Sequence, residues 1–154
     1  MARVAVFIAL SAIGGFIKIP SPTGTVALDS MPGYLGALVC GSPEGAIIAA
    51  LGHIFSAATV GFPMTLPIHL FVSIQMAAYA AAFGYVAMRL NIVAATVASV
   101  ILNGIIAPAL FIPLPGFGMA FFTGMVLPLV IGSAINVILA AVLFGALKGA
   151  RVID

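Results

Sequence analysis

The chain has very little charge, with five basic and three acidic residues among 154. An ordinary soluble domain carries roughly a quarter charged residues, so these few charges cannot cover a globule of this size in water. The single cysteine, Cys40, permits no intrachain disulfide. The net charge of +2 is too small to indicate binding of nucleic acid. The scarcity of charged residues excludes a soluble enzyme.

Apolar residues make up 64% of the chain, and the mean hydropathy is +1.38. This excess excludes a disordered chain. The apolar stretches run well past the ten or so residues of a barrel strand and do not alternate with polar residues, which disfavours a membrane β-barrel. We therefore expect an all-α membrane protein. At about 20 residues for each span, residues 1–154 form a single domain with at most about six spans.

Six apolar runs predict six helices, at residues 4–19, 31–40, 42–60, 68–88, 92–112 and 122–147. The second run is too short to span as an untilted helix, so it is either a short span or a segment partly buried among its neighbours. The first run, with Arg3 in front, also resembles a secretory signal, but it continues past any plausible cleavage site near Ser11. Pro- and Gly-rich segments at 20–32, 61–67 and 113–122 predict loops.

The cations favour one orientation of the bundle. Arg3, Arg89, Lys148 and Arg151 all fall on one side of the predicted helices, and Lys18 falls on the other. Because cytoplasmic segments of membrane proteins are enriched in Lys and Arg, we expect a compact bundle of six transmembrane helices with both termini cytoplasmic. The three Pro- and Gly-rich loops would then form lids on the outer side.

Polar side chains inside the predicted spans are few and therefore informative. They lie between the midplane and the outer surface, and Gln75 shares a helix face with Tyr79, four residues later. For each of them, hydrogen bonding between helices is as good an explanation as solute binding. Their common depth beneath three loops favours a solute site. The five residues are His53, His69, Gln75, Asn103 and Asn136.

Enzymatic chemistry has little support. The chain offers no pair of intramembrane carboxylates, no Ser-His-Asp set and no cluster of Cys and His at metal-ligand spacing. His53 and His69 lie on different predicted helices, and no further metal ligands are found near them. No ring of charges suggests a channel. We expect neither catalysis nor a bound metal or cofactor.

Four alanines recur along the first predicted helix at spacings of three and four, namely Ala2, Ala5, Ala9 and Ala12. Such a stripe lets another helix approach closely. One interpretation is packing within the chain, and the other is docking to a partner protein. Docking to a partner is favoured because the sequence contains no nucleotide site or ion relay that could energise transport.

These features resemble the substrate-binding S component of energy-coupling factor (ECF) vitamin transporters. The resemblance covers the whole chain, including AVFIA at residues 5–9, the Gly-x-Pro-x-Gly-Ala turn at 41–46 and ALGH at 50–53. Segments 17–30 and 59–69 are similar to the subgroup assigned to alpha-ribazole, a precursor of the lower ligand of cobalamin. The resemblance implies no metal substrate, because Met1-Ala2 lacks the amino-terminal histidine pattern of the nickel and cobalt members.

The resemblance implies a high-affinity solute receptor in the plasma membrane of a prokaryote. It would join a transmembrane T subunit and two cytoplasmic ATPases, which would use the ATP, and it would carry its solute inward by toppling in the lipid bilayer. The alternatives are an S component for another vitamin such as pantothenate, whose carboxylate would be anchored by Lys18 or a protonated histidine, and a membrane scaffold that transports nothing.

Alpha-ribazole is an uncharged dimethylbenzimidazole joined to ribose, so it needs flat apolar walls and several neutral hydrogen-bonding groups. His53, His69, Gln75, Asn103 and Asn136 supply the hydrogen-bonding groups in this interpretation. Asp29 is expected either to bind the ribose diol or to pair with Lys18 across the first loop. The candidate walls are Tyr34, Phe62, Tyr79, Phe111 and Phe117.

Overall fold

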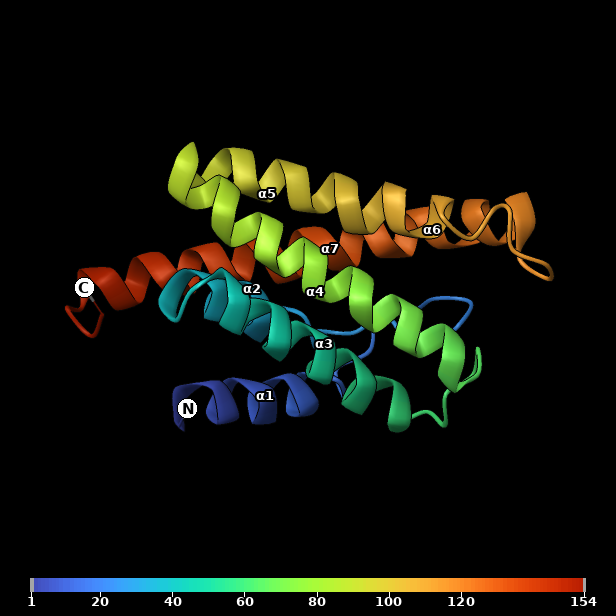
Figure 1. Cartoon of the computed structure of the whole chain (residues 1–154), viewed down its shortest axis with the longest axis horizontal. Helices are drawn as coiled ribbons and strands as arrows, with labels where there is room; N and C mark the ends of the chain where they lie inside the picture. The colour runs from blue at the N-terminus through green and yellow to red at the C-terminus, as the bar shows by residue number, and fades with distance from the viewer. Residues whose placement is uncertain (1, 154) are drawn as a thin grey trace.

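The structure is a computed structural model that describes residues 2–153, and every regular element in that range is helical (Figure 1). The all-α prediction is therefore confirmed. The elements are α1 (Ala2–Gly14), α2 (Met31–Val39), α3 (Ser42–Ala58), α4 (Leu66–Arg89), α5 (Ile92–Ile101), the π-helical turn η1 (Leu102–Ile106), α6 (Ala107–Ala109) and α7 (Gly118–Gly149). Since α5, η1 and α6 follow one another without a break, the chain forms six helical segments within the described range.

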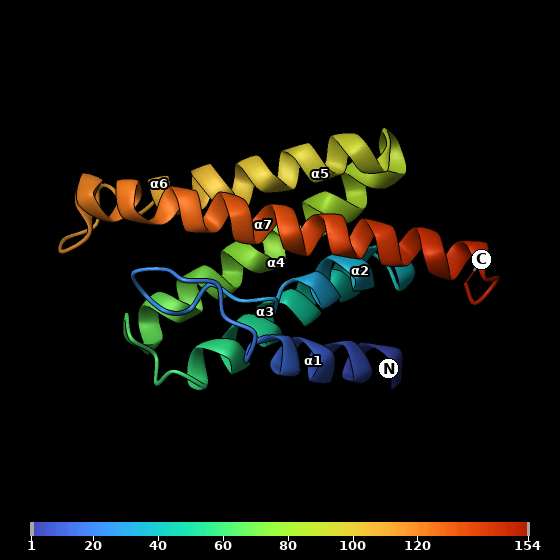
Figure 2. The same cartoon turned by 180° about the vertical axis from the view of Figure 1, so that it is seen from behind.

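The helices lie side by side along one long axis (Figure 1). Both chain ends lie at one end of the bundle with the α2–α3 and α4–α5 turns, which we call the terminal end. The opposite end, which we call the loop end, carries the 59–65 and 110–117 connections. Helix α3 packs against α1, α2 and α4, while α7 covers α2 from behind (Figure 2).

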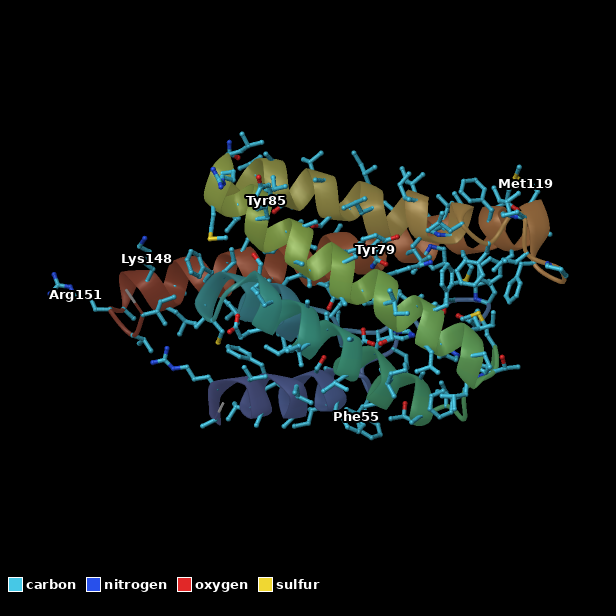
Figure 3. The ribbon with its side chains drawn as sticks, viewed as in Figure 1. Phe55, Tyr79, Tyr85, Met119, Lys148 and Arg151 are labelled. Atoms are coloured by element: carbon cyan, nitrogen blue, oxygen red, sulfur yellow. The ribbon has the colours of Figure 1, made fainter. Side chains whose placement is uncertain are left out.

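Three helical segments are long and apolar enough to cross a membrane by length and composition, namely Leu66–Arg89, Ile92–Ala109 and Gly118–Gly149. Helix α1 is apolar but shorter. At about 1.5 Å per residue, α7 is about 48 Å long, which exceeds the hydrocarbon thickness of roughly 30 Å. Its last turn carries Lys148, which lies with Arg151 beside the C-terminus (Figure 3).

The first helix is shorter than predicted, because it ends at Gly14 rather than at residue 19. Beyond Gly14 the chain folds back on itself: the Ile19 amide donates to Val26 O at 2.9 Å, and the Leu28 amide donates to Ile17 O at 3.1 Å. A Cβ at Gly14 would collide with the Leu28 backbone, so this close return requires glycine. The apolar residues after Gly14 belong to a loop, residues 15–30, that lies between α1, α3 and α7.

The short α2 is buried among its neighbours, which was one of the two possibilities for the second apolar run. The Tyr34 ring packs edge-on against Phe83 of α4, with centroids 5.2 Å apart. A Cβ at Gly33 would lie 2.7 Å from the Ala49 Cβ of α3, so the two helices touch through their backbones. This contact forms the tightly packed core of the terminal end.

The fifth predicted helix contains a π turn and ends at Ala109 rather than at residue 112. Proline in a helix lacks an N–H group and clashes with the carbonyl four residues earlier, so Pro108 conflicts with a regular helix at Gly104. A π turn relieves that conflict by widening the helix. The sixth helix begins at Gly118, earlier than the predicted 122, and contains Pro128.

Candidate functional site

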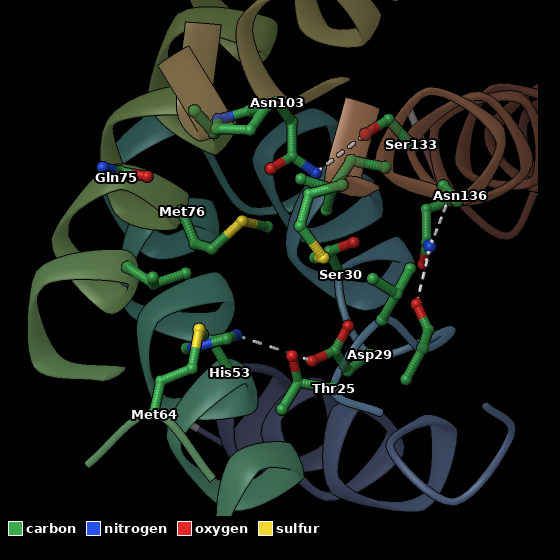
Figure 4. A pocket seen from close by; sticks show the side chains of 18 of the residues that line it. Thr25, Asp29, Ser30, His53, Met64, Gln75, Met76, Asn103, Ser133 and Asn136 are labelled. Atoms are coloured by element: carbon green, nitrogen blue, oxygen red, sulfur yellow. Dashed lines mark hydrogen bonds and ion pairs between the residues drawn. The ribbon is translucent and has the colours of Figure 1, made fainter. Parts of the chain in front are cut away.

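A cavity of about 70 Å³ lies between the loop 15–30 and helices α3, α4, α6 and α7 (Figure 4). Its apolar wall is rich in flexible and aromatic side chains, including Met64, Val72, Met76, Phe111, Phe121, Met125 and Leu129. Its polar groups come from the loop 15–30, α3, α4, η1 and α7, and they are Thr25, Asp29, Ser30, His53, Gln75, Asn103, Ser133 and Asn136. The arrangement has apolar walls and a few convergent polar groups, as small-molecule sites do.

Five of the ten predicted solute-binding residues line this cavity, namely Asp29, His53, Gln75, Asn103 and Asn136. They come from segments far apart in the sequence. Of the intramembrane polar residues predicted to lie at a common depth, four meet at this cavity, namely His53, Gln75, Asn103 and Asn136. What they bind stays a prediction.

Tyr34 and Tyr79 lie in the buried core instead of the cavity wall. Tyr79 shares a helix face with Gln75, but one turn carries it past the cavity into the terminal-end packing. Phe117 lies one layer behind the wall, where its ring packs 5.0 Å from Phe111 and 4.9 Å from Phe121. As wall residues these three were placed wrongly. For Tyr79, the reason is that a shared helix face does not fix depth along the helix.

Asp29 is held at the cavity by its own backbone. Its carbonyl accepts a hydrogen bond from the Ser11 hydroxyl of α1. Its carboxylate is 3.9 Å from His53 Nδ1. Burial raises the pKa of Asp29 to about 6, while the Ser56 hydroxyl and Lys18 act in the opposite direction.

Lys18 does not reach the cavity. Its Nζ lies 3.4 Å from both the carbonyl and the hydroxyl oxygen of Ser56. Within residues 2–153, no ion pair joins Lys18 directly to Asp29. The direct Lys18–Asp29 pair and the placement of Lys18 at the solute are therefore both wrong for this conformation.

His69 lies behind His53. His53 Nε2 is 3.2 Å from His69 Nδ1, so one ring donates a hydrogen bond and the other accepts it. The Phe62 ring covers His69 at a centroid distance of 5.7 Å. His69 was expected at the solute, but it supports His53 from the side away from the cavity.

Asn103 and Asn136 make hydrogen bonds within the chain. Asn103 Nδ2 donates to Ser133 Oγ at 2.8 Å, joining the π turn to α7. Asn136 Oδ1 accepts from the Met31 amide at 2.7 Å, and its Nδ2 donates to Ala27 O at 2.9 Å. Asn136 therefore fastens the loop 15–30 to α7.

Gln75 differs from the other amides. The residue is 6% exposed, and neither Nε2 nor Oε1 has a hydrogen-bond partner within the described residues. An unpaired buried amide is costly, because it has lost water without gaining a replacement. Gln75 is thus the lining residue with the largest unused hydrogen-bonding capacity.

Sequence reasoning missed Thr25, Ser30 and Ser133 as lining residues. Ser133 lies three residues before Asn136 on α7, so its place on the same helix face was available from spacing. Thr25 and Ser30 lie in the predicted 20–32 loop, and no periodic signal marks which loop residues turn inward.

The alanine stripe faces outward. Ala2, Ala5 and Ala9 are exposed and Ala12 is half-buried. Packing within the chain is therefore wrong as the explanation for the first three alanines. Docking to a partner stays a prediction.

A family model described as the substrate-specific component of ECF transporters matches residues 1–149. No curated protein and no solved structure matches the chain. Since the match covers almost the whole sequence, the chain belongs to the family of ECF transporter substrate-specific components. Members of this family are substrate-binding transporter subunits rather than enzymes, and the family implies separate T and ATPase subunits.

Proposed function

As an ECF substrate-specific component, this chain binds the solute of an importer, and we propose that the solute is alpha-ribazole, held in the cavity at the loop end. The observation that carries the proposal is the convergence of polar groups within a wall of methionine and phenylalanine. Asp29 can accept hydrogen bonds from the ribose hydroxyls, and Gln75 can donate a hydrogen bond to the free ring nitrogen. Phe111 and Phe121 offer flat surfaces to the benzimidazole.

The cavity must widen to hold such a solute. Sites for drug-sized molecules enclose about 300 to 1,000 Å³, well above the 70 Å³ found here. Met64 precedes α4, and Phe121 and Met125 lie in the first turns of α7. Methionine side chains adapt readily to a new shape. Outward movement of the loop-end wall is therefore part of the proposed binding step.

Pantothenate fits this cavity less well than an uncharged solute. Its carboxylate needs a cation, and no Lys or Arg appears among the lining residues that the structure describes. Of the two expected anchors, Lys18 contacts Ser56 instead. The other, a protonated histidine, would be His53, which already faces the Asp29 carboxylate at 3.9 Å.

Calorimetry on the purified subunit in detergent tests the substrate. We expect alpha-ribazole to bind and Gln75→Leu to weaken binding at least about fivefold, because the ligand loses a buried hydrogen-bonding partner. Arg89→Ala, at the end of α4 and away from the cavity, should leave binding unchanged. If pantothenate binds and alpha-ribazole gives no heat, the substrate assignment is wrong while membership of the family stands.

We also propose that all six helical segments insert in the plasma membrane of a prokaryote with the terminal end cytoplasmic. The end of α4 carries Arg89, while Lys148 and Arg151 lie beside the C-terminus (Figure 3). The positive-inside bias supports this orientation. In a background with Cys40 replaced by alanine, Gly116→Cys should react with an impermeant maleimide on intact cells and Asn91→Cys should not. Labelling of Asn91→Cys would overturn the orientation.

The exposed alanines of α1 support a docking role. We propose that Ala2, Ala5, Ala9 and Ala12 contact the T subunit, whose two ATPase partners use ATP while the loaded chain topples. Ala5→Leu with Ala9→Leu should therefore reduce uptake by cells that contain the whole transporter, while solute binding to the isolated subunit persists. Equal loss of binding and uptake would show that the stripe supports the fold instead.

A further inference from the structure

We propose that Asp29 and Gln75 select the chemical class of the solute: an uncharged or cationic molecule with an O–H or N–H donor for Asp29 and a polar edge for Gln75, to the exclusion of carboxylates. This inference rests on the proposed function, because it takes the cavity as the solute site. It extends beyond any single substrate, since it concerns the charge that the cavity accepts.

Asp29 is held in place through its backbone. The Asp29 carbonyl accepts a hydrogen bond from the Ser11 hydroxyl, and the side chain is only 9% exposed. A Cβ at Gly52 of α3 would collide with Ser11, so α1 and α3 close tightly around this part of the loop. This packing therefore keeps the Asp29 backbone, and the carboxylate that it carries, at the cavity wall.

The groups around Asp29 leave its charge facing the cavity. From α3 it meets His53 and Ser56, and from its own loop it is influenced by Lys18. Lys18 favours the ionised carboxylate but contacts Ser56 and does not line the cavity. Among the lining residues described, Asp29 is the one acid, and none is Lys or Arg. An anion would meet a fixed like charge without a balancing cation.

Gln75 supplies the second contact, across the cavity from Asp29 (Figure 4). Its amide offers both a donor and an acceptor, and neither has a partner in the part of the chain that the structure describes. Met76 lies between the two polar groups in the same view, and Met64 lies beside His53. The solute that fits this arrangement has polar groups at two ends of an apolar body.

A panel of solutes tests this selection by calorimetry with the full subunit in lipid nanodiscs. Alpha-ribazole and adenosine are the uncharged probes, thiamine is the cationic probe, and pantothenate and biotin are the carboxylates. We expect binding within the uncharged or cationic group and none among the carboxylates. For the solute that binds, Asp29→Asn should weaken binding at least about tenfold, as loss of a hydrogen bond to a charged group does. Glu44→Gln, the same chemical change at the start of α3, is the matched control and should have no effect.

Each outcome distinguishes this inference from the substrate assignment. Binding of thiamine or adenosine without alpha-ribazole removes the substrate named above and supports the selection by charge. Binding of a carboxylate, unchanged binding by Asp29→Asn, or the failure of every uncharged and cationic probe overturns the selection. If Asp29→Asn does not fold, Gln75→Leu serves in its place, because the Gln75 side chain has no hydrogen-bond partner to lose among the described residues. Unchanged solute binding by Gln75→Leu would likewise overturn the selection.

Discussion

The two ends of the bundle are built differently. At the terminal end, α2, α3 and α4 meet through glycine and alanine, and large rings such as Tyr34 and Phe83 fill the remaining space. At the loop end, the loop 15–30 and the helices α3, α4, α6 and α7 surround a cavity whose polar groups are only partly paired. Close packing provides stability, whereas unpaired polar groups cost stability and are available to a ligand. The unpaired groups that a ligand can use are therefore separated along the long axis from the close packing of α2, α3 and α4.

Two buried amides make the same contrast within one cavity. Asn136 uses its oxygen and nitrogen to hold Met31 and Ala27. Gln75 uses neither of its polar atoms within residues 2–153. Asn136 therefore belongs with the parts that maintain the fold, although it lines the cavity, and Gln75 belongs with the parts that bind.

The largest expected effect comes from exchanging these amides for leucine. Asn136→Leu leaves the Met31 amide and the Ala27 carbonyl without partners, at about 1 to 3 kcal/mol each. Its melting temperature in detergent should fall sharply. Gln75→Leu removes an unpaired amide, so its melting temperature should stay level or rise. Equal destabilisation by both variants would mean that Gln75 is paired within the fold.

A smaller loss is expected from Gly33→Val at the terminal end. The new side chain would meet Ala49 of α3 at 2.7 Å, and overpacking of this kind costs about 1 to 3 kcal/mol. Gly145→Ala on α7 is the matched control, because a Cβ there meets nothing within 4 Å. That change should leave the melting temperature level or raise it, since alanine favours helix more than glycine does. A tolerated Gly33→Val would contradict the close packing of α2 on α3.

The smallest effect concerns pH. Burial raises the pKa of Asp29 from 3.8 to about 6, so between these values the folded protein binds more protons than the unfolded chain. Stability from this group is therefore present at low pH and is lost as pH rises through about 6. Between pH 5 and pH 7.5 the loss amounts to about 1 kcal/mol. Melting at the two pH values should show this loss in the natural protein and a smaller one in Asp29→Asn. An unchanged pH dependence in the variant would show that Asp29 is not the group responsible.

Much of the helical architecture follows from the sequence, because long apolar runs have few other stable forms in a membrane. The predicted helix bounds are wrong where tertiary contacts, rather than hydropathy, decide whether a helix continues. The run through Ile17 and Ile19 is apolar enough to continue α1, but the glycine at position 14 lets the chain return against Leu28. The π turn before Pro108 depends on how a helix accommodates one proline, which hydropathy does not report.

The site was predicted in part for a similar reason. Scarce polar residues inside spans are expected to face one another, and this brought His53, Gln75, Asn103 and Asn136 to the cavity. The sequence does not predict well how deep a residue lies along a helix. Tyr79 lies one turn too far from the cavity, and His69 lies behind His53. The pairing state of each amide depends on atomic contacts, so the difference between Gln75 and Asn136 was not available from the sequence.

Hydrogen exchange with and without alpha-ribazole tests most directly whether the solute binds at the loop end and leaves the terminal end unaffected. Saturating solute should slow exchange of backbone amides in 23–30, 62–66 and 110–117 at the loop end. The turns at 40–42 and 89–91 of the terminal end should exchange at their original rates. Protection of the terminal-end turns, or unchanged exchange at all three loop-end segments when calorimetry shows binding, would contradict a solute site in this cavity.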